Sequence, residues 1–70
     1  MYTIKLFTRN WQTEKVIASR NNFEEAQKIF NATIIEDFNL TNNELAKESY
    51  ISKALFSDTD FIDSEVLKDV

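Results

Sequence analysis

The chain contains no glycine, proline, cysteine or histidine in its 70 residues. Without glycine it has no glycine-rich loop whose backbone N–H groups close on a phosphate, which excludes a P-loop and a dinucleotide-binding fingerprint. Without cysteine and histidine it has no zinc finger, thiol nucleophile, Ser-His-Asp triad or haem-attachment motif, and the usual general base is missing. The polar and aromatic side chains that remain are typical of a binding surface. We therefore expect a protein that is not an enzyme and uses no cofactor.

The length and composition indicate one domain that spans residues 1–70. Hydrophobic residues make up 43% of the chain, so apolar packing can hold the fold without disulfides. No apolar run resembles a signal peptide or approaches the roughly 20 residues of a membrane span, so we expect a soluble, cytoplasmic protein. A carboxylate enzyme is the least favoured function, because a chain this small offers little concave volume in which to raise the pKa of a carboxyl group.

The net charge of −4 is unevenly distributed along the sequence. The first 20 residues carry a net charge of +3, and the remaining 50 residues carry −7. The overall negative charge disfavours nucleic acid as the main partner, because affinity for nucleic acid depends on the neutralisation of phosphates.

The first 20 residues predict a β-hairpin. Tyr2, Ile4 and Leu6 alternate with polar residues, which is the period of a half-buried strand. A second β-rich segment, residues 14–19, follows a turn at residues 10–12. Because the chain has no glycine, asparagine is the residue that we expect to adopt a positive φ in this turn.

The next segment has the period of a helix, which we predict over residues 23–37. Asn22 precedes Glu25 by three residues, as in a capping box with asparagine as the N-cap. Residues at spacings of three and four form one apolar stripe, which we expect to enter the core. The stripe consists of Phe23, Ala26, Phe30, Ile34 and Phe38.

The last 30 residues predict a second hairpin. A short helical turn at residues 44–46, capped by Asn42 or Asn43, separates it from the main helix. Residues 50–56 are apolar at both parities, which indicates a central strand.

Residues 61–67 fit either a strand or a C-terminal helix capped by Asp60 or Ser64, and we favour the strand because the connection at 58–60 is short. The prediction is an α+β fold of ββαββ type, a small antiparallel sheet with one amphipathic helix across one face. The alternative is ββαβα.

Four carboxylates within eight residues form the first candidate site: Asp58, Asp60, Asp63 and Glu65. Their Asp-x-Asp start resembles an EF-hand loop, but Asp63 stands at the position that requires glycine, and Asp69 stands at that of the bidentate glutamate. We therefore expect no metal here. Together with Glu36 and Asp37, these side chains instead offer an acidic surface that imitates phosphates against a basic groove.

The alternative site is the tip of the first hairpin, where the only tryptophan lies among basic residues: Arg9, Trp11, Lys15 and Arg20. An aromatic side chain among cations can stack on bases and bind phosphates. It can also anchor a protein interface, or fold back over a thin core. The sequence leaves these three interpretations open.

The composition resembles that of small acidic orphan proteins of phages and mobile elements in low-GC bacteria. The features that carry this resemblance are seven asparagines, seven isoleucines, six lysines and six phenylalanines, with an isoelectric point near 4.6. The resemblance implies a non-enzymatic, protein-binding inhibitor of a host defence or nucleic-acid-binding protein, such as an anti-CRISPR protein or a DNA mimic. The expected partner is a host protein with a basic groove, bound by a monomer or homodimer. The alternative function is a small nucleic-acid-binding domain that uses the basic hairpin.

Overall fold

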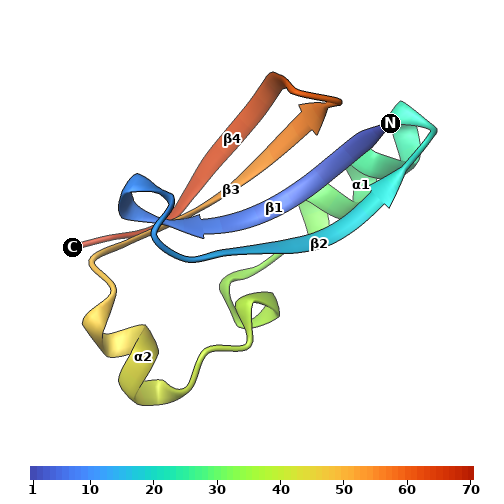
Figure 1. Ribbon diagram of the computed structural model, residues 1–70. Coiled ribbons are helices and arrows are strands. Elements are labelled where there is room, and N and C mark those ends of the chain that lie inside the picture. The colour runs from blue at the N-terminus through green and yellow to red at the C-terminus, as the bar shows by residue number, and fades with distance from the viewer.

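The computed structural model describes residues 1–70 as a four-stranded antiparallel sheet with one main helix against one face (Figure 1). The strand order is β2-β1-β3-β4. The strands are β1 (Tyr2–Thr8), β2 (Glu14–Arg20), β3 (Tyr50–Ser57) and β4 (Asp60–Asp69). The helix α1 (Phe23–Ala32) begins the connection from β2 to β3. The predicted α+β class is confirmed. The ββαββ order accounts for these five elements but omits a second, short helix, α2 (Asn42–Lys47).

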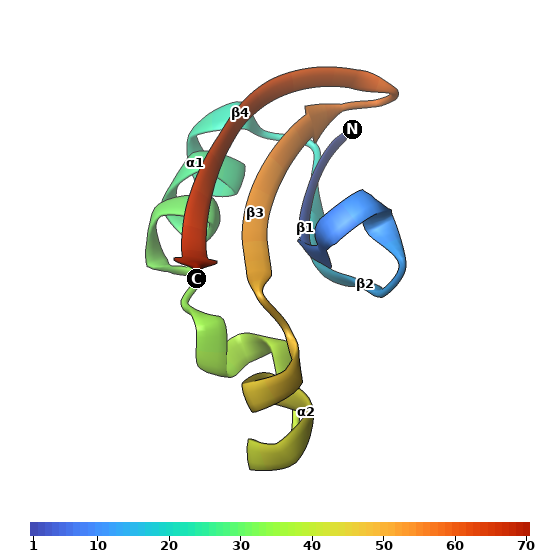
Figure 2. The ribbon, with the colours of Figure 1, turned by 90° about the vertical axis from the view of Figure 1, so that its left-hand side faces the viewer.

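The first hairpin forms as predicted, around the short 3-10 turn η1 (Arg9–Trp11). Asn10 has a φ of 58°, which confirms that asparagine takes the left-handed conformation in this turn. Trp11 also has a φ of 58°, which is costly for a bulky side chain and was not expected. Thr8 closes the turn, because its hydroxyl oxygen accepts a hydrogen bond from the Thr13 N–H at 3.0 Å. Figure 2 shows η1 and α1 on opposite sides of the strands.

The second hairpin settles the ambiguous C-terminal segment. Residues of β4 pair with β3 from Asp60 to Asp69, so the predicted strand is confirmed and the alternative ββαβα fold is wrong. The central position of β3 is also confirmed, because its residues from Ile51 to Leu55 are buried at both parities.

The main helix begins as predicted but ends earlier. The Asn22 side chain accepts a hydrogen bond from the Glu25 N–H at 3.1 Å, which fixes the start. The helix ends at Ala32 rather than residue 37, because Thr33 has an extended backbone and Lys53 binds the terminal carbonyl groups.

The early end of α1 changes the last part of the predicted apolar stripe. Ile34 lies beyond the helix and is exposed, so its assignment to the core is wrong. Phe38 is buried as expected, but from the 3-10 turn η2 (Ile35–Phe38) instead of from α1.

The helix α2 lies beyond the end of the sheet (Figure 1). Its predicted cap at Asn42 or Asn43 is wrong, because Thr41 forms a reciprocal capping box with Glu44. The Thr41 hydroxyl oxygen accepts a hydrogen bond from the Glu44 N–H at 3.2 Å, and the Glu44 carboxylate accepts one from the Thr41 N–H at 3.1 Å. Serine or threonine three residues before glutamate is the usual form of this motif.

The two core clusters lie between the sheet and the segments that cover its helix side, while Phe7 and Ala54 are buried on the other face. One cluster consists of Ile4, Ala26, Phe30 and Leu55, and a second of Leu6, Phe38 and Ile51. Only 13 of the 70 residues are buried, so this core is thin. Neither cluster of the core extends to the opposite face of the sheet. Neither helix has the length and hydropathy that a membrane crossing requires.

Candidate binding surface

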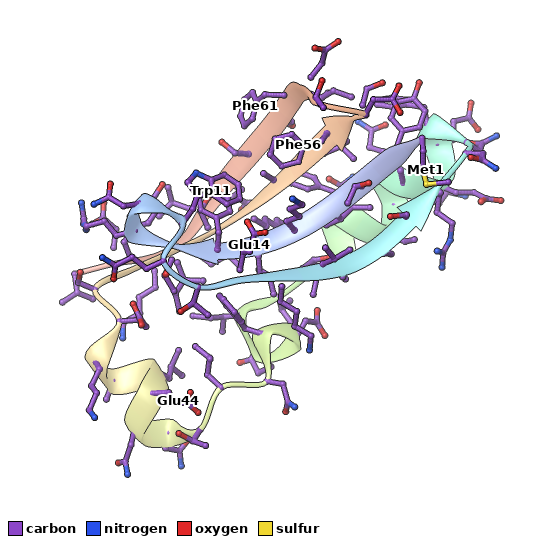
Figure 3. The ribbon with its side chains drawn as sticks, viewed as in Figure 1. Met1, Trp11, Glu14, Glu44, Phe56 and Phe61 are labelled. Atoms are coloured by element: carbon purple, nitrogen blue, oxygen red, sulfur yellow. The ribbon has the colours of Figure 1, made fainter.

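The sheet face opposite α1 carries a row of four aromatic rings, and we call this side of the sheet the aromatic face. Successive residues of a strand point to opposite faces. Because Ile4 and Leu6 pack toward α1, the side chain of Phe7 points away from it. The row consists of Phe7, Trp11, Phe56 and Phe61. Figure 3 shows Trp11, Phe56 and Phe61 following one another across the strands.

The rings of the row are in direct succession. The centroids of Phe7 and Trp11 lie 3.6 Å apart with an angle of 10° between the ring planes, so the two rings are stacked. Trp11 and Phe56 are 6.0 Å apart, and Phe56 and Phe61 are 6.0 Å apart at 79°, an edge-to-face contact. The edge-to-face contact of Phe56 with Phe61 is a geometry that aromatic pairs prefer, whereas the face-to-face rings of Phe7 and Trp11 lie closer than the usual range of about 4.5–7 Å. The row therefore forms one continuous aromatic surface from η1 to β4.

The turn η1 determines where the indole lies. Two successive residues with positive φ, Asn10 and Trp11, turn the chain back over the sheet. Trp11 consequently does not project from the hairpin tip but lies on Phe7. Of the three interpretations that the sequence left open, the side chain adopts the folded-back position. It nevertheless keeps 41% of its surface exposed.

The aromatic face is open to solvent in part, because Phe7 is buried beneath Trp11 and Phe56 is half-buried, while other apolar side chains are exposed. Val16 of β2 lies opposite Lys5, and Val66 of β4 lies opposite Ser52, so both valines are on this face. The exposed fractions are 41% for Trp11, 53% for Val16, 60% for Phe61 and 49% for Val66. Exposed apolar residues that gather on one surface mark interaction sites, whereas single ones are ordinary.

The charges on the aromatic face are balanced. The Lys5 ammonium group lies 5.6 Å from the Phe56 centroid and 3.8 Å from a Glu14 carboxylate oxygen. The Arg9 guanidinium group lies 5.2 Å from the centroid of the Tyr50 ring. Asp69, opposite Tyr50 in the register, is the second acidic residue of this face. Two cations and two carboxylates make the face neutral, so the net charge of −4 lies on the rest of the molecule.

The predicted acidic surface is divided into two groups. Four of its members lie on β4 and the turn that precedes it: Asp58, Asp60, Asp63 and Glu65. The other two, Glu36 and Asp37, belong to η2. The carbonyl oxygen of Asp37 accepts a hydrogen bond from Lys15 of β2, which is the sheet edge opposite β4. The six carboxylates therefore do not form one row.

Several of these carboxylates have hydrogen-bond or ion-pair partners within the chain. Asp58 accepts a hydrogen bond from the Met1 ammonium group at 3.0 Å, and Asp63 accepts one from the Ser64 N–H at 2.8 Å. Glu65 lies 3.4 Å from the Lys53 ammonium group, and Asp37 accepts a hydrogen bond from the Ile34 N–H at 2.9 Å. No three of the acidic side chains are placed to hold a metal ion.

The predicted basic hairpin tip is also divided. Arg9 and Trp11 share the aromatic face. Lys15 is opposite Leu6 in the register and therefore points to the helix side, where it binds Asp37. Arg20 lies at the far end of β2, opposite Tyr2, and donates to the Ser19 carbonyl group at 2.8 Å.

Three members of the aromatic row were not predicted from the sequence as site residues: Phe7, Phe56 and Phe61. The strand register could have indicated them. The alternation that places Leu6 in the core places Phe7 on the other face. A short turn at 58–60 brings Phe61 opposite Phe56. The role of Lys53, which is buried beneath the end of α1, was missed as well. A lysine in an otherwise apolar central strand was the signal for it.

The surface has no pocket, so the aromatic face is an open surface rather than a cleft. The chain matches no protein-family model, no curated protein and no solved structure.

Proposed function

We propose that this protein is a non-enzymatic protein-binding module and that the aromatic face is its contact surface. The observation that carries the proposal is the row formed by Phe7, Trp11, Phe56 and Phe61 on the sheet face opposite α1. Aromatic side chains are enriched in protein interfaces, where they supply much of the binding energy from a few central positions.

The charge balance supports a protein partner over nucleic acid. Binding to nucleic acid depends on cations that neutralise phosphates. The aromatic face is neutral, and its Lys5 is already close to Glu14. Lys15 and Arg20, which the nucleic-acid hypothesis also needs, do not share this face with Arg9 and Trp11.

An inhibitory role extends the proposal. Asp58 in the turn and Asp60 at the start of β4 directly precede Phe61, so two carboxylates lie near one end of the aromatic row. This arrangement suits a host defence or nucleic-acid-binding protein that presents an apolar patch beside basic residues, the kind of target that anti-CRISPR proteins and DNA mimics bind. Opposite charges beside such a patch increase the association rate and the specificity of binding.

Matched variants on an affinity support test this function. The immobilised wild type is expected to retain a protein from a nuclease-treated lysate of a low-GC bacterium. Phe61→Thr, which keeps a β-branched residue in the strand, should abolish retention, and Asp58→Lys with Asp60→Lys should weaken it. Ile34→Thr is the control, because Ile34 is equally apolar and exposed but lies outside the aromatic face.

Two outcomes would contradict the proposal. Retention that survives Phe61→Thr but is lost on the acidic reversals would place the contact on the acidic turn alone. Binding of a labelled oligothymidine, lost on substitution of Arg9 or Trp11, would instead favour the nucleic-acid function.

A further inference from the structure

We propose that a second copy of this chain covers the aromatic face, so that two copies pack sheet against sheet about a two-fold axis in solution. This inference rests on the proposed function, because both assign the aromatic face as the contact surface. It goes further because it identifies the partner on this face as a second copy of the chain.

Charge is the first argument for a second copy. The aromatic face is neutral, with Lys5 and Arg9 balanced by Glu14 and Asp69. The rest of the molecule carries the whole net charge of −4. Two copies that approach through any other broad surface meet like charge, whereas contact between aromatic faces directs the acidic surfaces away from each other. A face that holds both signs is also able to complement itself about a two-fold axis.

The width of the exposed apolar surface is the second argument. Val16 belongs to the edge strand β2, and both Val66 and Phe61 belong to the other edge strand, β4. Trp11 lies between the two edges, on Phe7 of β1. Burial of all four requires a partner that is as wide as the sheet. A single peptide or helix would cover only part of this width, and another copy of the same face matches it.

The area is sufficient for a reversible dimer. Strands of about seven residues, which rise ~3.3 Å per residue and lie ~4.8 Å apart, give the face a size of about 19 by 23 Å. Two such faces cover roughly 900 Å² in projection, and side-chain relief raises the accessible area toward the ~1,200 Å² at which specific interfaces begin. We therefore expect a dissociation constant on the order of 1–100 µM, at the weak end for such interfaces.

Pairing through the sheet edges is disfavoured. The edge strand β4 carries four carboxylates and one lysine, so two copies of it would repel each other. Register shifts also interrupt the pairing of β1 with β2 and of β3 with β4. Charged residues and irregular pairing are the features that protect edge strands from association.

Sedimentation velocity over a concentration series tests this inference. The wild-type mass should rise from 8.2 kDa toward twice that value. The fluorescence of Trp11, the only tryptophan, should shift to shorter wavelength with the same midpoint, because association removes the indole from water. The double variant Phe61→Thr/Val66→Thr should remain a monomer at every concentration, and the control Ile34→Thr should associate like the wild type.

Salt dependence separates this dimer from association through charges. The midpoint should change less than about three-fold between ~0.05 and ~0.5 M NaCl, since the contact is neutral and charge–charge attraction is the component that salt screens. A chain that stays at 8.2 kDa at its highest soluble concentration would overturn the inference. A dimer that persists in the double variant would overturn it too.

These experiments can contradict the second copy without contradicting the proposed function, and the reverse. A monomeric chain that still retains a lysate protein through Phe61 would leave the proposed function intact and remove the second copy as the occupant. A dimer that depends on Phe61 and Val66, in a chain that retains no other protein, would support the second copy and remove the heterologous partner.

Discussion

At the scale of single residues, Lys53 binds the carbonyl groups at the end of the main helix. Its side chain is 3% exposed, and the ammonium group donates to the carbonyl groups of Phe30 at 2.6 Å, Asn31 at 3.4 Å and Thr33 at 3.0 Å. These carbonyl groups lie at the helix C-terminus, where backbone acceptors lack partners and positive charge is favoured. The ion pair with Glu65 adds little, because that carboxylate is mostly exposed.

The substitution Lys53→Met tests this role, because methionine keeps much of the apolar stem and removes the ammonium group. The free energy of unfolding, measured with urea, should fall by about 2–4 kcal/mol, since the Thr33 carbonyl group loses the charged donor Lys53 and the Phe30 carbonyl group keeps only the Thr33 N–H. Lys28→Met, at an exposed position of α1, should change it by less than about 0.5 kcal/mol. Equal stability of the Lys53 variant and the wild type would show that another contact holds the helix end.

At the scale of elements, α2 depends on its capping box. The pKa of Glu44 lies below its ordinary value of 4.5, chiefly because its carboxylate accepts a hydrogen bond from the Thr41 N–H, with a further contribution from the Thr41 side chain. A carboxylate whose pKa is lowered by folding stabilises the folded state above its unfolded pKa. This contribution is lost as the pH falls through the folded pKa.

The pH dependence of α2 should therefore appear only in acid. The amide proton of Thr41 is expected to titrate with a midpoint below 4.5, observed by NMR, and α2 should lose helical chemical shifts over the same range. Glu44→Gln keeps an acceptor oxygen but cannot titrate, so its Thr41 amide should not shift with this midpoint. A wild-type midpoint at or above 4.5 would mean that the capping box is not formed in solution.

The elements also show how far local sequence patterns determine this fold. The alternation in residues 2–6 and the Asn22–Glu25 cap act over a few residues, and both predictions were correct. The end of α1 was wrong because it depends on Lys53, which lies about 20 residues away in the sequence. The cap of α2 could have been predicted from the sequence, since Thr41 and Glu44 form the usual capping-box motif.

At the scale of the whole molecule, the two sides of the sheet have different chemistry. The helix side contains the thin core, and the aromatic face combines exposed rings with balanced charges. From the sequence we predicted that Trp11, Arg9 and Lys15 belong to one site. Trp11 and Arg9 do share the aromatic face, but Lys15 points to the other side. Strand register decides which side chains share a face, and a shift of one residue reverses that assignment. The site was therefore less predictable than the strands that form it.

The most direct test of the central claim, that the aromatic face is a contact surface which a second copy of the chain covers, is a dilution series of ¹H–¹⁵N NMR spectra. With increasing concentration, the account predicts shifts at the amides of η1 and of strand residues whose side chains lie on the aromatic face, together with the indole N–H of Trp11. Amides of α1 and η2, on the other side of the sheet, should not move. Spectra that do not change with concentration, or shifts that concentrate on α1 and η2, would contradict the account.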